Sequence, residues 1–162
     1  MKQKLKIGVL GPHDCSAEER SLGFEIGAEI ARLGAILVCG GLGGMMEAAA
    51  EGAKSEQGLT VGILPGEDTS SANAFIDVAL PTGLGPVRNA LIVRACDAVI
   101  AIRGGYGTLS EISFALRLGV PVVGLQTWSV VQDGKTDAGI HAAKTPKEAV
   151  AMAIKLCVAA AL

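Results

Sequence analysis

The sequence is poor in aromatic residues, since only three phenylalanines, one tyrosine and one tryptophan occur among its 162 residues. Half of the residues are nevertheless hydrophobic, so the core has to be built from Ala, Val, Ile and Leu. The length corresponds most simply to one domain, residues 1–162, that is able to bury a core. The 22 glycines show no collagen-like period. They are typical of turns that join aliphatic strands to helices.

The sequence also has no cluster of basic residues. It carries 14 basic and 16 acidic residues, for a formal net charge of −2. Binding along a nucleic-acid backbone needs a concentrated positive surface, so no nucleic-acid partner is expected. A small anion in a focused site remains compatible with this charge. No uncharged apolar stretch is long enough to span a bilayer, so no membrane partner is expected either.

The four cysteines, Cys15, Cys39, Cys96 and Cys157, include no Cys-x-x-Cys pair and have no nearby histidine partner. A disulfide framework and a protein-bound metal site are therefore both disfavoured. Reduced cysteines favour a cytoplasmic location. The lysine-rich start is followed only by the short apolar run 7–10, which is too short for a signal sequence and is typical of a first strand.

Aliphatic runs and helical patterns alternate along the chain. Strands are predicted at 5–10, 35–39, 59–64, 75–80, 97–102 and 120–125, and helices at 17–33, from 45, at 87–95, at 108–118 and at 145–160. Residues 128–144 are expected to be less regular, with a turn at Asp133-Gly134. Continuously apolar strands indicate a parallel sheet covered on both faces. The predicted fold class is α/β, a single-domain Rossmann-like doubly wound sheet with helices on both faces.

Three glycine-bearing turns follow predicted strands, at Gly11-Pro12, at 40–44 and at 104–108. In a doubly wound sheet all three lie at the edge where ligands bind. Each turn could simply be a tight connection, but two dense clusters at one edge favour a phosphate held by backbone N–H groups and a helix dipole. The predicted ligand-binding residues are Gly11, Pro12, Gly41, Gly43, Gly44, Met45, Arg88, Asn89, Gly104, Gly105, Tyr106, Gly107 and Thr108.

Glu111 is open to two interpretations. Thr108-x-x-Glu111 fits a capping box, in which the carboxylate caps its own helix. Alternatively, the carboxylate lies at the pocket and stabilises charge at a sugar C1 or activates water there. Arg88 is a candidate phosphate clamp. His13 and Asp14 either contact the ligand or belong to a polar surface loop.

The residues Arg88-Asn89, the run 97–100 and Gly104-Gly105-Tyr106-Gly107-Thr108-x-x-Glu111 together resemble the Rossmann-like superfamily once labelled "lysine decarboxylase-like". It includes the LOG nucleoside 5'-monophosphate phosphoribohydrolases and the molybdenum cofactor carrier proteins. In the hydrolases the signature begins with proline and follows an Arg-Lys pair. This chain has Arg103 and Asn89 at those positions, and keeps Arg88 and Glu111 as the implied catalytic residues.

The carrier branch is more similar in the segments 63–70 and 81–85. The resemblance implies an oligomer, a dimer or tetramer, that binds the phosphate-bearing molybdenum cofactor without transforming it. A carrier of this cofactor is the favoured hypothesis. A phosphoribohydrolase that releases base and ribose 5-phosphate is the alternative, so the sequence leaves open whether the protein is an enzyme.

Overall fold

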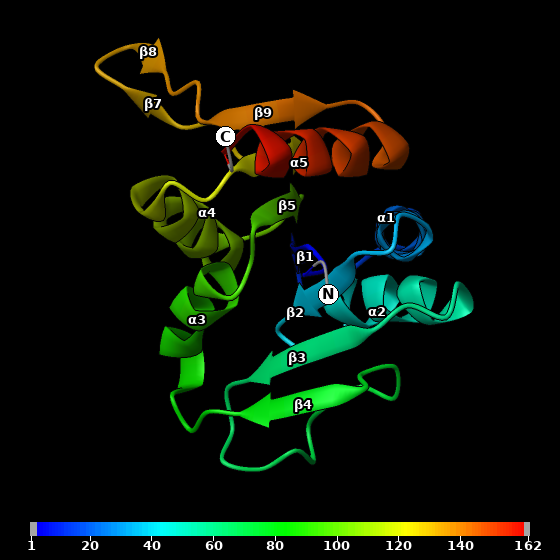
Figure 1. The fold of residues 1–162 in the computed structure, drawn as a ribbon. Coiled ribbons are helices and arrows are strands. Elements are labelled where there is room, and N and C mark those ends of the chain that lie inside the picture. Colours follow the sequence, from blue (N-terminus) through cyan, green and yellow to red (C-terminus); the bar gives the residue numbers. More distant parts are fainter. Residues whose placement is uncertain (1–2, 161–162) are drawn as a thin grey trace.

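The computed structural model describes residues 3–160, in which strands and helices alternate (Figure 1). The main sheet contains β1 (Lys6–Leu10), β2 (Ile36–Cys39), β3 (Thr60–Leu64), β4 (Val78–Pro81), β5 (Ala98–Ile102), β6 (Val122–Leu125) and β9 (Ile140–Ala143). The helices are α1 (Ala17–Arg32), α2 (Met45–Ser55), α3 (Asn89–Arg94), α4 (Tyr106–Leu118) and α5 (Pro146–Ala160). A 3-10 helix, η1 (Gly85–Arg88), precedes α3, and β7 (Val131–Gln132) and β8 (Lys135–Thr136) form a separate hairpin.

The main sheet is parallel throughout, with the order β4-β3-β2-β1-β5-β6-β9. The first strand lies inside it, with Ile7 opposite Leu37 of β2 and Gly8 opposite Val99 of β5. Strands β2, β3 and β4 therefore follow one another on one side of β1, and β5, β6 and β9 follow one another on the other side. This is the predicted Rossmann-like α/β sandwich, which the structure confirms.

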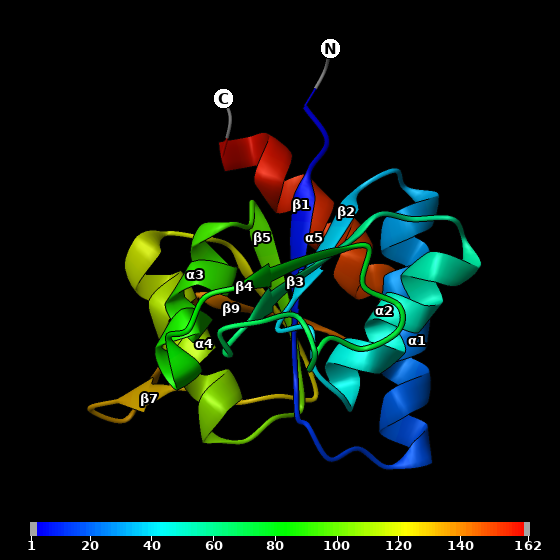
Figure 2. The same cartoon turned by 90° about the horizontal axis from the view of Figure 1, so that it is seen from below.

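Helices cover both faces of the sheet (Figure 2). Helices α1, α2 and α5 pack over one core, in which Ile26 and Ala49 meet Leu37 and Ile100. Helices α3 and α4 pack over the other core, in which Ile92 and Ile112 meet strand residues such as Val99. These side chains are aliphatic or small, as the scarcity of aromatic residues predicts.

Glycines let α1 and α2 approach closely. A Cβ added at Gly27 of α1 would lie 1.8 Å from the carbonyl oxygen of Ala49, and one at Gly52 of α2 would lie 1.9 Å from that of Phe24. The N-terminus of α1 is closed by the predicted capping box. The Glu19 amide donates to Ser16 Oγ over 3.2 Å, and the Ser16 amide donates to Glu19 Oε2 over 2.8 Å.

Several boundaries differ from the sequence prediction. Strand β9 was missed because Ile-His-Ala-Ala is no continuous β-branched run, and because it forms an edge strand on which His141 and Ala142 are exposed. The helix predicted at 87–95 divides into η1 and α3. Helix α4 begins at Tyr106, two residues before the predicted start. Asp133-Gly134 does form a turn, between β7 and β8.

The reversal of strand order between β1 and β5 creates a crevice at their carboxyl ends. The loop that follows β1 and the turn that follows β5 both border it. Within residues 3–160, no helix combines the length and the apolar character that crossing a membrane requires.

Candidate functional site

A cavity of about 380 Å³ occupies this crevice. The loop after β1 and helix α2 supply Gly11, Pro12, His13, Asp14 and Met46. The segment from η1 into α4 supplies Arg88, Asn89, Gly105, Gly107, Thr108 and Glu111. Segments that are far apart in the sequence therefore meet at one cavity, and it contains a buried cation and a buried carboxyl group.

The turn between β5 and α4 is shaped by glycine. Gly104 has φ of 100°, and a Cβ there would lie 2.3 Å from Thr108 Oγ1. Gly105 is the N-cap of α4, and no side chain caps this helix. Its first amides therefore keep their N–H groups available at the positive end of the helix dipole. Gly105, Gly107 and Thr108 line the cavity, so these donors border it.

This helix start rules out the capping-box interpretation of Glu111. Because α4 begins at Tyr106, Glu111 is the sixth residue of the helix and lies too far along it to cap the first turn. The side chain instead lines the cavity and is 7% exposed. It makes no hydrogen bond or ion pair with any described residue. Burial raises the pKa of the Glu111 carboxyl to about 7, and the Arg88 charge only partly opposes that rise.

Arg88 is the buried cation of the site. It ends η1, is 8% exposed, and its Nε is the one buried side-chain polar atom of the described residues that lacks a hydrogen-bond partner. Nη2 donates to the Gly40 carbonyl oxygen over 3.4 Å, and Nη1 donates to Asn89 Oδ1. A side chain at Gly40 would collide with this guanidinium, because its Cβ would lie 2.6 Å from Nη2.

Nothing anionic neutralises Arg88 at close range. Burial raises the pKa of the neighbouring Cys39 thiol to about 11, so this thiol is neutral near pH 7. Burial also lowers the pKa of Arg88, although Glu111 and Cys39 raise it. An arginine remains charged despite such a shift. A buried guanidinium with a free donor is the usual partner of a phosphate or carboxylate.

Asn89, beside Arg88, connects the two halves of the site. Its Nδ2 donates to Ser110 Oγ of α4 over 3.3 Å, and its Oδ1 accepts from Arg88. The structure therefore brings the predicted pair Arg88-Asn89 and the predicted turn after β5 together at one cavity. Gly11 and Pro12 line the same cavity. Gly104 shapes the turn without lining this cavity, and Tyr106, which is 84% exposed, does not line it either.

The second glycine turn, residues 40–44, lies outside the lining of this cavity. Gly41, Gly43, Gly44 and Met45 do not line the cavity. The Met45 side chain is fully buried, and its amide donates to the Pro12 carbonyl oxygen over 3.0 Å. The structure therefore uses the start of α2 to hold the loop after β1, and only Met46 of this helix reaches the cavity.

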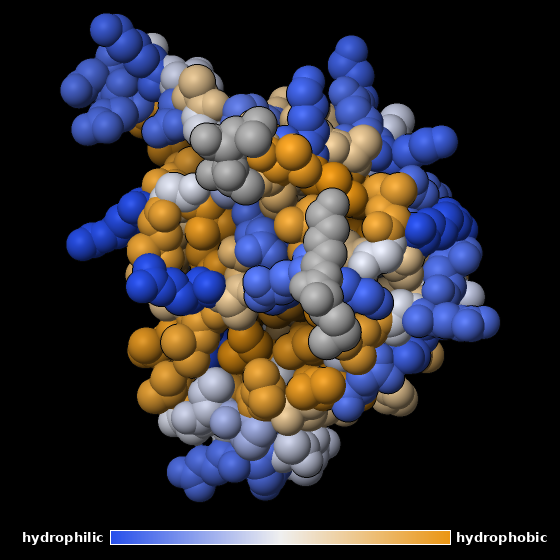
Figure 3. All heavy atoms as spheres, in the orientation of Figure 1, coloured by the Kyte–Doolittle hydropathy of each residue, from blue (hydrophilic) through white to orange (hydrophobic). Residues whose placement is uncertain are grey.

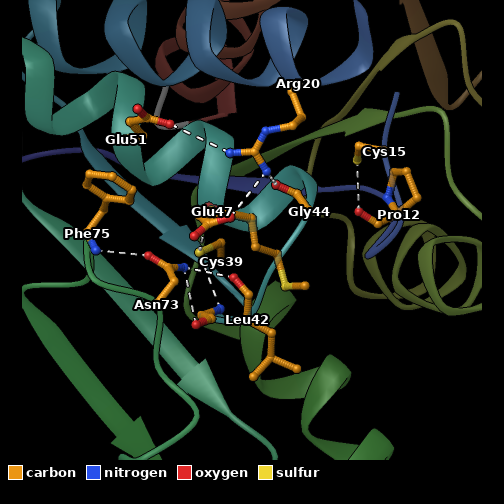
Figure 4. A network of polar contacts seen from close by, with 12 residues as sticks. Pro12, Cys15, Arg20, Cys39, Leu42, Gly44, Glu47, Glu51, Asn73 and Phe75 are labelled. Atoms are coloured by element: carbon orange, nitrogen blue, oxygen red, sulfur yellow. Dashed lines mark hydrogen bonds and ion pairs between the residues drawn. The ribbon is translucent and has the colours of Figure 1, made fainter. Parts of the chain in front are cut away.

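Polar contacts keep this second turn in place (Figure 4). Asn73 Nδ2 donates to the carbonyl oxygens of Gly41 and Leu42 over 3.2 and 2.8 Å. Arg20 reaches the Gly44 carbonyl oxygen at 3.5 Å and forms ion pairs with Glu47 and Glu51. These contacts come from α1 and from the loop before β4, so no local pattern could have predicted them.

A second cavity, of about 540 Å³, adjoins the first. Pro12 and Asp14 line both cavities, and the glycine turn lies between them. The second cavity is completed by Glu19, Arg103, Gly104, Gln126, Thr127, Trp128 and Ser129. Sequence reasoning missed the residues after β6. The available signal was the single tryptophan of a chain with few aromatic residues.

Comparisons with known proteins agree with the fold. The model of the SLOG cluster4 family matches residues 4–150. An uncharacterized protein of Archaeoglobus fulgidus is 42% identical over 146 residues, which are 90% of this chain and 92% of that protein. The structure of the molybdenum cofactor binding protein from Rippkaea orientalis superimposes with a TM-score of 0.87, at 33% identity, covering 98% of this chain and 99% of that one. The molybdenum cofactor carrier protein from Chlamydomonas reinhardtii gives a TM-score of 0.84, also at 33% identity, over 96% and 99%.

Proposed function

Because this chain belongs to the SLOG cluster4 family and has the same fold as molybdenum cofactor carrier proteins, we propose that it binds and carries the molybdenum cofactor. The cofactor is a phosphate-bearing pterin, and the protein holds it as cargo. The site residues predicted from the turn after β5, together with Arg88 and Asn89, hold its phosphate. Among residues 3–160, no three His, Cys, Asp or Glu side chains are grouped as the ligands of a metal ion would be.

One observation supports this proposal most directly. The Nε of the buried Arg88 has no partner, and the Arg88 side chain lines the same cavity as the uncapped start of α4. A phosphate would accept hydrogen bonds from both the guanidinium and the helix amides. It would also supply the negative charge that the buried arginine lacks.

Glu111 allows the same cavity to accept an anion. A carboxyl group whose pKa is about 7 is protonated in a large fraction of molecules at neutral pH. The protonated form does not repel a phosphate and can donate a hydrogen bond to it. Binding of the ligand therefore favours the protonated form of Glu111.

The presence of Arg88 and Glu111 in one cavity also supports a second candidate function, hydrolysis of a nucleoside 5'-monophosphate. In this reaction the bond from C1' to the base nitrogen breaks, and a bond from C1' to a water oxygen forms. Glu111 would accept a proton from the attacking water, a task that suits a carboxyl group with a pKa near the working pH. One water proton is delivered to the departing base.

The two functions are separated by incubating the purified protein with AMP, GMP and CMP and analysing the mixture for free base. Saturable binding of molybdenum cofactor without release of base supports the carrier. Release of base that is abolished in Glu111→Gln, with an unchanged circular dichroism spectrum, would establish the hydrolase and reject a pure carrier.

We also propose that the protein is a homo-oligomer that assembles through α3 and α4. Large apolar side chains are exposed along this side of the molecule, and they gather at the left in Figure 3. They are Leu84, Val87, Leu91, Phe114 and Leu118. A hollow of about 330 Å³ lies between the two helices, bordered by Leu91 and Phe114. Apolar surface of this kind favours a second copy of the chain as partner.

A cytoplasmic location remains part of the proposal, since all four cysteines are free and three of them are buried. Free thiols are typical of a reducing compartment. The prediction that nucleic acid is no partner also stays a prediction, which rests on the net charge of −2.

A further inference from the structure

The only tryptophan and the only tyrosine of the chain meet at the glycine turn after β5. The ring centroids of Tyr106 and Trp128 lie 5.9 Å apart, and the rings are tilted by 31°. The indole Nε1 donates to the carbonyl oxygens of Gly104 and Gly105 over 3.1 and 3.2 Å. Trp128 is thus fixed against the turn, whereas Tyr106 is 84% exposed. This pair offers an aromatic surface to a flat ligand, because Tyr106 is exposed and Trp128, which packs against the edge of the core under α3 and α4, is only partly buried.

The second cavity lies beside this aromatic pair, at the carboxyl ends of β1, β5 and β6. Trp128 lines it, and Pro12 and Asp14 connect it to the cavity that contains Arg88. A ligand whose phosphate is held at the start of α4 can therefore extend around the turn and place its heterocycle in the second cavity.

A cationic and an anionic side chain face this space. The Arg103 Nε lies 3.6 Å from Glu19 Oε1, while the other oxygen of Glu19 accepts from the Ser16 amide. Glu19 thus holds the guanidinium in place. The Asp14 carboxylate is exposed and makes no hydrogen bond or ion pair with any described residue, so it remains available as an acceptor.

The backbone of this cavity is strained at two positions. Arg103 has φ of 51° and Gln126 has φ of 53°, at the ends of the neighbouring strands β5 and β6. Neither is glycine, and a Cβ makes this left-handed conformation unfavourable. The Thr127 hydroxyl donates to the Arg103 carbonyl oxygen over 2.5 Å and ties the two turns together. Strain of this kind is found where side chains are positioned for a ligand.

We propose that the second cavity binds the edge of a 2-amino-4-oxo-pyrimidine ring, as found in pterins and in guanine. The Asp14 carboxylate accepts from two adjacent N–H groups, on N3 and on the 2-amino nitrogen, and Arg103 donates to the 4-oxo oxygen. Adenine offers the carboxylate only one amino group, and hypoxanthine has no 2-amino group. Trp128, which lines the cavity, provides the stacking surface, and the neighbouring Tyr106 ring extends it. This inference rests on the proposed function, since it assumes a phosphate in the first cavity.

The test uses equilibrium titrations of the full-length protein with GMP, IMP and AMP, each followed for free base. GMP and IMP differ only in the 2-amino group, so we expect GMP to bind at least tenfold more tightly. Asp14→Asn should remove most of this difference. Glu18→Gln, which neutralises an exposed carboxylate in the same segment, should preserve it. Tyr106→Ala should weaken GMP at least fivefold and leave ribose 5-phosphate unchanged.

Ribose 5-phosphate separates this inference from the proposed function, because it probes the phosphate position alone. If ribose 5-phosphate binds in an Arg88-dependent manner while GMP, IMP and AMP bind equally well, the heterocycle inference is overturned and the proposed phosphate site stands. If no phosphate ester binds, the proposed function itself fails. A phosphorylated pterin that binds more tightly than GMP would identify a pterin as the ligand, and the reverse order would identify a guanine nucleotide.

Discussion

Arg88 and Glu111 are both buried in one cavity, and each lacks the partner that a side chain of its type normally has when buried. Arg88 keeps a free Nε, and Glu111 makes no hydrogen bond or ion pair with a described residue. Burying such groups without partners costs stability. A protein tolerates this cost where the groups bind a ligand. Each of the two residues should therefore lower the stability of the fold and, at the same time, favour binding of the ligand.

Replacing Arg88 by Met should weaken binding of ribose 5-phosphate at least tenfold, because a charge-assisted hydrogen bond contributes roughly 1.5–3 kcal/mol. The variant's melting temperature without ligand should stay the same or rise, since a buried charge is removed. Calorimetric titration and thermal denaturation measure the two effects. Lys147→Met, which changes an exposed basic residue of α5, is the matched control. Unaltered affinity in Arg88→Met would contradict the phosphate site.

Glu111 should make stability depend on pH. Its pKa of about 7 in the folded protein lies above the ordinary 4.5, so the folded state holds the proton more tightly than the unfolded state. The contribution of Glu111 to the free energy of unfolding is fully present below pH 4.5 and is lost as the pH rises through 7. Glu111→Gln should remove this dependence and be more stable than the natural protein at pH 8, by on the order of 3 kcal/mol.

Urea denaturation at pH 5 and at pH 8 measures this difference. The control is Glu25→Gln, because Glu25 is an exposed residue of α1. Parallel pH profiles for the natural protein and Glu111→Gln would show that Glu111 is not the titrating group.

At the scale of elements, the turn between β5 and α4 determines the site. Gly104 combines φ of 100° with a Cβ position only 2.3 Å from Thr108 Oγ1. Gly107, in the first turn of α4, has open space around its Cβ position. A side chain can therefore be accommodated at Gly107 but not at Gly104, although both glycines belong to the same motif.

Gly104→Ala should destabilise the protein by about 2 kcal/mol or more, because the backbone conformation disfavours Ala and the methyl group collides with Thr108. Gly107→Ala should leave the stability unchanged or raise it by up to about 1 kcal/mol, since Ala is the better helix former. Chemical denaturation of both variants tests the difference. Equal stabilities would contradict the assigned turn geometry.

At the scale of the whole molecule, the apolar side of α3 and α4 lies next to the ligand cavity. The same two helices supply Asn89, Thr108 and Glu111. Assembly through this side would bury Leu91, Phe114 and Leu118, and it would fix the relative position of the helices that border the cavity.

Leu118→Glu should dissociate the oligomer, because a carboxylate in an apolar contact has to be desolvated. Sedimentation velocity measures the change in mass. Val131→Glu, at an even more exposed apolar position of the β7–β8 hairpin, should leave the assembly intact. A monomeric natural protein, or dissociation only in Val131→Glu, would contradict the proposed interface.

The sequence by itself determined the fold class, the capping box at Ser16 and the glycine turn between β5 and α4. Each of these depends on local chemistry. Continuously apolar strands require a sheet covered on both faces, and a glycine turn before a helix leaves N–H groups free. The pairing of Arg88-Asn89 with this turn was also predicted, through the family resemblance, and both line the cavity.

Only the tertiary structure decided which glycine turn borders the cavity and where Glu111 lies. The turn at 40–44 is held by Asn73, Arg20 and Pro12, which are distant in the sequence. A shift of two residues in the start of α4 turned Glu111 from a helix cap into a cavity residue. Its raised pKa then follows from burial, which is a property of the packed molecule and not of any local pattern.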